Sequence, residues 1–134
     1  MGHYELVILF HPYKLATIED ALSPYLELIA KTGELLALES WGRQDLSYPI
    51  KKMLKAEYVF LQFSSTPEVL AELNKASRFD PLVLRCLTVK LKGEAAYMPT
   101  ELIDLEITNK LLTQLNLNLT EANPEQPEIK EEVS

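Results

Sequence analysis

The chain has 134 residues, of which 47% are hydrophobic and 25% charged, and its formal net charge is −7. This length and composition predict one soluble domain that buries roughly two-thirds of the surface of the unfolded chain. There is no apolar run near the ~18 residues that span a bilayer, and residues 1–5 lack the basic and apolar parts of a secretory leader, so we expect a cytoplasmic protein without membrane contact.

The first elements alternate between strand and helix patterns. Residues 3–10 have a period of two, with apolar side chains from Tyr4 to Phe10 on one face, which is typical of a strand. Residues 18–31 have helical spacing after a Thr17 N-cap. Pro24 lies inside this helix and predicts either a kink or a second segment that begins at Ser23.

The middle of the chain predicts a strand, a loop and a second strand. The second strand covers Leu35–Arg43, and alternation places Glu39, Trp41 and Arg43 on one face. A lysine-containing loop follows, and the third strand covers residues 56–64, with Tyr58 and Phe60 on its non-core face. Together with Trp41 these rings predict an apolar patch on the side of the sheet that the helices leave open.

The last elements are a helix, a strand and an extension. Thr66 and Pro67 open a helix that ends near Ser77, and residues 82–91 form the last strand. Residues 101–117 show some helical periodicity, whereas Pro, Glu, Asn and Gln dominate from residue 119, which predicts disorder. We therefore divide the chain into a domain over residues 1–95, a helical extension over 96–118 and an acidic disordered tail over 119–134.

The order strand, helix, strand, strand, helix, strand predicts an α+β, ferredoxin-like β-α-β-β-α-β fold, a four-stranded antiparallel sheet with two helices on one face. From two right-handed crossovers we expect the first and last strands at the centre and the second and third at the edges. In that arrangement Lys90 and Lys92, at the end of the last strand, lie beside the lysines of the loop.

The negative charge is concentrated in the C-terminal quarter. Residues 1–100 carry 11 Lys and Arg against 12 Asp and Glu, a balance of −1, and residues 101–134 carry 2 against 8, a balance of −6. A nearly neutral domain can still present a basic edge, because phosphate binding depends on where charges cluster. The overall acidity therefore does not exclude RNA binding.

Catalytic and metal-binding patterns are weak. His3 and His11 lie at opposite ends of one strand, roughly 26 Å apart at ~3.3 Å per residue, and do not share a site. Cys86 is the single cysteine, within an apolar strand, and the four glycines are isolated, which excludes a disulfide, a thiolate cluster and a Gly-rich phosphate loop. We predict no enzymatic activity, no cofactor, no metal and no small-molecule substrate.

The chemistry that the sequence favours is docking. Aromatic residues alternate with cations around residues 41–60, a composition that suits phosphate neutralisation combined with ring contacts to bases or to a partner protein. The alternative is a solvated lysine loop with aromatic residues that pack an edge strand. From the strand pattern we take Lys55, Lys90 and Lys92 as candidate RNA contacts, and Tyr58 and Phe60 as candidate partner contacts.

The run Trp41-Gly42-Arg43-Gln44-Asp45-Leu46-Ser47-Tyr48-Pro49-Ile50-Lys51-Lys52 resembles the Trp-Gly-Arg-Arg-x-Leu-(Ala/Ser)-Tyr-Pro-Ile-x-Lys signature of the bacterial small-ribosomal-subunit protein six family. Tyr4-Glu5 resembles the aromatic-Glu pair at the start of the family's first strand. Residues 79–85 resemble its Phe-Asn-Asp-x-Val-Ile-Arg segment. Gln44 departs from the signature, because the family has a basic residue there.

This resemblance implies a non-catalytic ribosomal protein. It implies a partner, small-subunit ribosomal protein eighteen, and binding to the central domain of 16S ribosomal RNA. The positions that it carries over are Arg43, Lys51, Lys52 and Arg85 as RNA contacts, with Trp41 and Tyr48 as partner contacts.

Two other functions remain open at this point. Residues 56–63 loosely resemble the aromatic third-strand motif of RNA-recognition domains, which bind single-stranded RNA, although Glu57 stands where that motif has glycine. A small regulatory or acylphosphatase-type domain is the other alternative, and it requires a deep pocket lined by converging polar groups.

Overall fold

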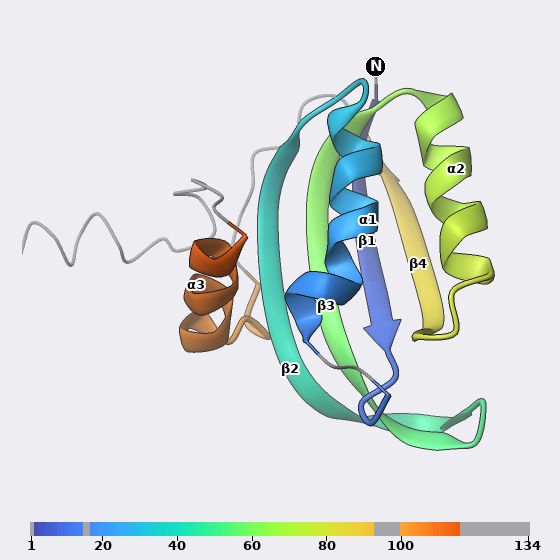
Figure 1. Cartoon of the computed structure of the whole chain (residues 1–134), viewed down its shortest axis with the longest axis vertical. Helices are drawn as coiled ribbons and strands as arrows, with labels where there is room; N and C mark the ends of the chain where they lie inside the picture. The colour runs from blue at the N-terminus through green and yellow to red at the C-terminus, as the bar shows by residue number, and fades with distance from the viewer. Residues whose placement is uncertain (1, 15–16, 93–99, 116–134) are drawn as a thin grey trace, which may run out of the picture.

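The computed structural model describes residues 2–14, 17–92 and 100–115. Its four strands are β1 (Gly2–Phe10), β2 (Leu35–Ile50), β3 (Met53–Ser65) and β4 (Val83–Leu91). They form one antiparallel sheet in the order β2-β3-β1-β4. The predicted ferredoxin-like fold is therefore confirmed (Figure 1).

The predicted strand order was wrong for the last two strands. The central strands are β1 and β3, and the edges are β2 and β4. The β2–β3 hairpin places β3 beside β2. The two β-α-β units interleave, because β3 lies between β1 and β2, and β1 lies between β3 and β4. The last strand therefore has an outer edge that pairs with no other strand in the described part of the chain.

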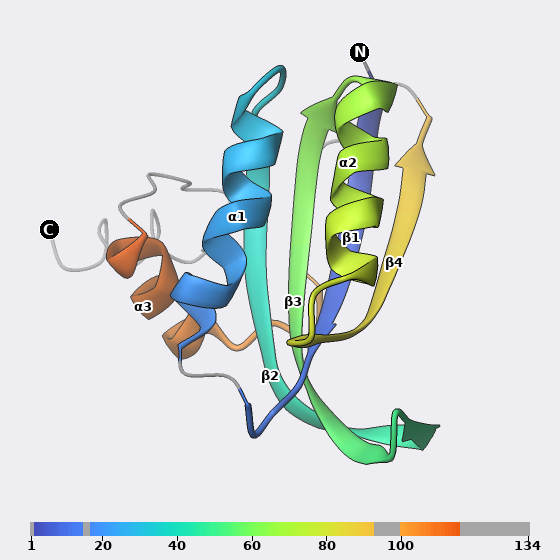
Figure 2. The ribbon, with the colours of Figure 1, turned by 45° about the vertical axis from the view of Figure 1, so that its right-hand side comes forward.

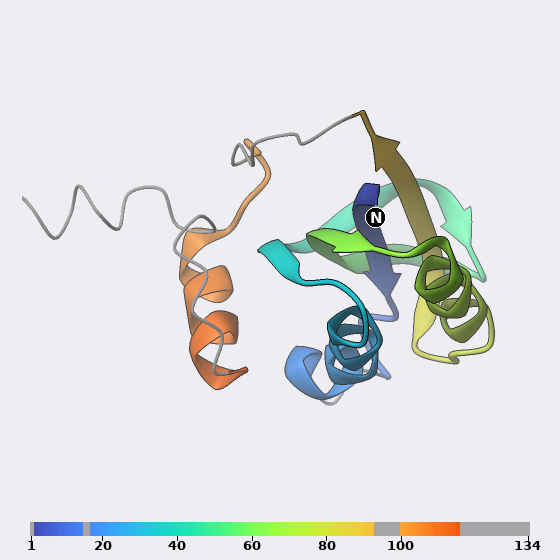
Figure 3. The ribbon, with the colours of Figure 1, turned by 90° about the horizontal axis from the view of Figure 1, so that it is seen from above.

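Two helices cover one face of the sheet, as predicted (Figures 2 and 3). Helix α1 (Ile18–Ala30) begins at Thr17, whose side chain accepts a hydrogen bond from the Asp20 backbone N–H. Pro24 lies within one continuous helix, and the Ser23 hydroxyl donates to the Glu19 carbonyl, so Ser23 does not cap a second segment. None of the helices in the described ranges has the length and apolar character needed to cross a membrane.

Helix α2 (Pro67–Arg78) has Thr66 as its N-cap, as the sequence predicts, and leads through a short turn into β4. The Tyr25 hydroxyl donates to Asp80 Oδ2 over 2.7 Å, and Asp80 Oδ1 accepts from the Leu82 N–H. Burial, followed by the bond to Asp80, raises the pKa of Tyr25 far above its ordinary value. The neutral Tyr25 side chain therefore stabilises the turn that connects α2 to β4.

The main core lies between the sheet and these helices. Alternate β1 residues, Tyr4, Leu6, Ile8 and Phe10, are buried there, which confirms the predicted core face of the first strand. The third helix, α3 (Leu105–Gln114), lies within the predicted extension and contributes Leu111 and Leu112 to the same core. The predicted tail over 119–134 lies outside the described residues.

Candidate nucleic-acid interface

The predicted loop after residue 43 is instead the end of a long β-hairpin. Strand β2 continues to Ile50, β3 begins at Met53, and only Lys51 and Lys52 connect them. Both lysines have positive φ angles, 50° and 69°, as both central residues of a type I′ turn require. Such turns usually contain Asn and Gly, so the sequence offered no turn signal here.

The hairpin end bends onto the open face of the sheet, toward the start of β4 (Figure 3). Leu46, Ile50 and Met53 pack against a small second core made by Leu9, Ala56 and Leu84. The Lys51 ammonium donates to the Val83 carbonyl over 3.2 Å. These contacts hold the two lysines of the turn beside the first residues of β4.

Tyr48 and Arg85 are brought together by the same bend. Arg85 Nη1 donates to the Tyr48 hydroxyl over 2.8 Å, and Tyr48 is 57% exposed. Arg85 pairs with Leu9 in the sheet register, which places it on the open face. Four of the predicted site residues therefore lie in one region, although they are separated by up to 37 positions in the sequence: Tyr48, Lys51, Lys52 and Arg85.

Three predicted aromatic contacts form a stack on the open face. The Trp41 ring lies over those of Tyr58 and Phe60, with centroid separations of 6.0 and 5.7 Å. Trp41 is half-buried, and Phe60, beneath it, is only 4% exposed. The rings occupy the predicted face, but the expectation of an exposed patch is wrong for Phe60, because Trp41 covers it.

Arg43 does not share the face of Trp41, contrary to the prediction. The register of β2 against β3 shifts between Ser40 and Gly42, where Gly42 has a φ of +77°. A β-bulge of this kind inserts one residue and reverses the alternation after it. Arg43 therefore lies on the helix side, where its guanidinium is 5.3 Å from the Tyr13 ring centroid.

The predicted cations differ in whether a carboxylate neutralises them. Arg43 pairs with Glu57 at 3.1 Å, and Lys55 pairs with Asp45 at 3.0 Å. No ion pair within the described residues includes Lys51, Lys52 or Arg85. Lys51 and Lys52 in the hairpin turn and Arg85 near the start of β4 thus remain available to an external anion.

Comparison with known proteins identifies the family of this chain. Residues 3–90, more than half of the chain, match the family described as Ribosomal protein S6. The chain belongs to the ribosomal protein S6 family. The resemblance seen in the sequence is thereby confirmed, and the chain is a small-subunit ribosomal protein.

A solved structure from the S6 family has the same fold. The 30S ribosomal protein S6 of Thermotoga maritima is 22% identical in sequence, with a TM-score of 0.63. The match covers 67% of the present chain and 87% of the Thermotoga chain. At this identity the likeness concerns the fold.

Lys90 and Lys92 do not join the cationic region of this S6-family chain. Lys90 pairs with Tyr4 near the start of β1, at the opposite end of β4 from Val83. Seven residues separate Lys90 from Val83, which corresponds to about 23 Å at ~3.3 Å per residue. The expectation that these lysines lie beside the hairpin lysines is wrong, because β3 and β4 both run antiparallel to β1, so β4 starts rather than ends at the hairpin end of the sheet.

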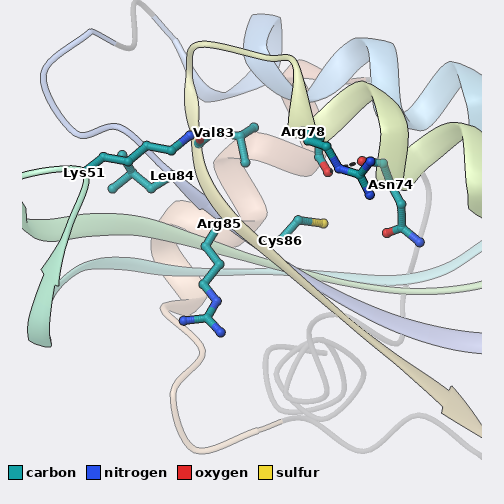
Figure 4. A pocket seen from close by; sticks show the side chains of 8 residues that line it. Lys51, Asn74, Arg78, Val83, Leu84, Arg85 and Cys86 are labelled. Carbon is teal, nitrogen blue, oxygen red and sulfur yellow. Dashed lines mark hydrogen bonds between the residues drawn. The ribbon is translucent and has the colours of Figure 1, made fainter.

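Sequence reasoning missed Asn74 and Arg78 at the end of α2. They line a cavity together with Lys51 and the first residues of β4 (Figure 4). Their spacing of four residues in a helix places them on one face, which was the only available signal. Their approach to Lys51 depends on the bent hairpin, which the sequence did not predict.

The groups in this region suit non-covalent binding. Within the described residues, no set of three or more His, Cys, Asp or Glu side chains is arranged to hold a metal ion. The His11 ring nitrogen Nδ1 accepts from the backbone N–H groups of Tyr13 and Lys14 and so stabilises the turn after β1. Cations, hydroxyls and aromatic rings are the groups that face outward.

Proposed function

We propose that this chain is a structural constituent of the small ribosomal subunit that binds the central domain of 16S ribosomal RNA together with small-subunit ribosomal protein eighteen. In this proposed role the chain acts in the cytoplasm, on the ribosome, without catalysis or a cofactor. We also propose residues 1–95 as the binding domain, with 96–118 as its extension and 119–134 as its tail. Membership of the S6 family supports this function.

The observation that carries the proposal is the cationic hairpin end. Lys51 and Lys52 are exposed in a turn whose backbone conformation is unfavourable for lysine. Arg85 donates a hydrogen bond to Tyr48, which belongs to the same hairpin end. These cations are free of carboxylate partners among the described residues, in a chain whose net charge is −7. Unpaired cations can neutralise phosphates and release their counterions.

Arg43, Lys55, Lys90 and Lys92 have weaker support as RNA contacts. The first two would have to exchange a carboxylate for a phosphate, and the other two lie at the far end of β4. We therefore assign the principal role to Lys51, Lys52 and Arg85, and we propose secondary roles for the remaining four.

The proposed partner surface centres on Tyr48. Leu87 and Val89 are also exposed, and they follow Arg85 along the open face of β4. Tyr58 and Phe60, beneath Trp41, support this surface from below. The same burial argues against the RNA-recognition alternative, because that function needs open rings on which bases stack.

The test is binding of the full chain to a 16S central-domain RNA fragment, with and without protein eighteen, at several salt concentrations. We expect weak binding by the chain alone, tighter binding with the partner, and a log–log salt slope of about −2 to −3 for three phosphate contacts. Lys51→Gln with Lys52→Gln should reduce the affinity about tenfold.

The matched control is Lys31→Gln, which removes an exposed cation that pairs with Glu72 and lies outside the hairpin. It should reduce affinity less than twofold. If the wild-type chain neither bound this RNA nor co-sedimented with small subunits at low salt, the proposed function would be wrong.

A further inference from the structure

A groove of about 420 Å³ runs between the last turn of α2 and the first half of β4 (Figure 4). Three parts of the fold line it: the hairpin turn, the end of α2 and the outer edge of β4. The lining residues are Lys51, Asn74, Ser77, Arg78, Val83, Leu84, Arg85 and Cys86. Since no strand of the described chain pairs along this edge, an extended ligand can lie against it.

The groove carries positive charge, and no acidic side chain among its described lining residues offsets that charge. Two of its eight lining residues, Lys51 and Arg78, carry a cation on the groove side, and none of the eight is acidic. Arg78 is exposed and forms no ion pair within the described residues. Burial raises the pKa of the Cys86 thiol, so this residue stays neutral near pH 7 and adds no negative charge.

The polar side chains of α2 are held with donors available. The Thr88 hydroxyl donates to Asn74 Oδ1 over 3.1 Å, which directs the amide oxygen toward β4 and leaves the Nδ2 hydrogens for a ligand. The Ser77 hydroxyl donates to the Asn74 backbone carbonyl, which fixes that side chain beneath Arg78. Arginine and amide donors of this kind are common contacts to phosphate oxygens.

Lys51 and Arg78 come from different elements and stand at different ends of the groove (Figure 4). The Lys51 ammonium is held at the Val83 carbonyl, so it stays at the hairpin end. Arg85 contributes its backbone side, while its guanidinium turns to the open face and Tyr48. Cations spaced along an edge match the consecutive charges of a nucleic-acid strand better than one compact anion.

We propose that this groove binds the sugar–phosphate backbone of an RNA strand, with Arg78 and Asn74 on one phosphate and Lys51 on a neighbouring one. The inference rests on the proposed function and extends the RNA contact from the hairpin turn to α2. It makes Arg78, which no sequence pattern singled out, a positioning contact for the strand.

The test compares Arg78→Gln with Lys75→Gln in the full chain. Lys75 is an exposed cation of the same helix, but it lies by Leu28 and Phe79, away from the groove. For binding of the 16S central-domain fragment, Arg78→Gln should reduce affinity about three- to tenfold and make the salt slope shallower by about one. Lys75→Gln should change neither, and circular dichroism melting should show both variants folded.

The groove proposal would be overturned if Arg78→Gln bound RNA like Lys75→Gln while the paired hairpin variant bound weakly. That result would leave the proposed function intact, whereas no binding by the wild-type chain would remove the function itself. Inorganic phosphate and an acidic peptide are the competing ligands, titrated while the side-chain NMR signals of Arg78 and Asn74 are followed. Saturation by either one as tightly as by RNA would also overturn the proposal.

Discussion

The two edges of the sheet differ in how their backbone is covered. At the β2 edge, the Asp104 N–H donates to the Ser40 carbonyl over 2.8 Å, and the Ser40 N–H donates to the buried Thr108 hydroxyl over 2.9 Å. At the β4 edge, the Lys51 side chain covers the Val83 carbonyl and borders a groove. Unpaired edges invite association, so proteins usually cover or charge them. This chain covers one edge with its own α3 and charges the other.

The first prediction concerns the packing that closes the β2 edge. Leu111 is 3% exposed and belongs to the main core, so Leu111→Ala should lower the free energy of unfolding by about 3 kcal/mol. Leu102→Ala, in the same extension but 49% exposed, should lower it by less than about 0.5 kcal/mol. Urea denaturation of both variants measures the difference. Equal values would mean that α3 does not share the domain core.

The second prediction concerns a buried carboxylate at the same edge. Glu39 is fully buried and accepts hydrogen bonds from Trp41 Nε1 at 2.8 Å and from the Thr100 N–H and hydroxyl at 3.1 and 2.6 Å. Glu39→Gln keeps the volume but replaces one acceptor oxygen by an amide NH2, which would face at least one of these donors, at a cost of about 2 kcal/mol. Thermal unfolding should show this loss, and Glu101→Gln, at an exposed residue, should not.

The third prediction separates stability from binding at the open edge. Lys51→Asn with Lys52→Gly fits the type I′ turn better, so it should raise the free energy of unfolding by about 1 kcal/mol. The same pair removes two cations and should weaken RNA binding about tenfold. Denaturation and RNA titration on one preparation give both values. Changes of the same sign would argue against charge as the reason for lysine in this turn.

The smallest expected effect is at an exposed position of β4. Val89 is 54% exposed on the open face, so Val89→Ser should change the free energy of unfolding by less than about 0.5 kcal/mol. The variant should nevertheless bind protein eighteen more weakly, because Val89 lies in the proposed partner surface. A stability loss close to that of Leu111→Ala would show that this face is closed in the free protein.

The elements were predictable because their signals are local. The period of two in residues 3–10 and the caps at Thr17 and Thr66 depend on neighbouring residues alone, and each appears in the structure as predicted. The helix signal also outweighed Pro24, because α1 is continuous through it.

The candidate site was predicted only in part, because its geometry depends on single backbone positions. The bulge at Gly42 moved Arg43 to the other face, and the Lys51-Lys52 turn had no Gly or Asn to mark it. Arg78 could not be identified, since it lines the same groove as Lys51 only through the tertiary fold. The residue types of this region predict RNA contact. Which cations pair with carboxylates and which do not depends on the three-dimensional structure.

The single tryptophan of the chain provides a built-in optical probe of the closed edge. Trp41 rests on two rings and shares the Glu39 carboxylate with Thr100, the first described residue of the segment that carries α3. Release of that segment would alter the indole's polarity and its quenching. Emission spectra of the free chain and of the chain bound to an RNA fragment would therefore reveal, without any label, whether the segment that carries α3 is released.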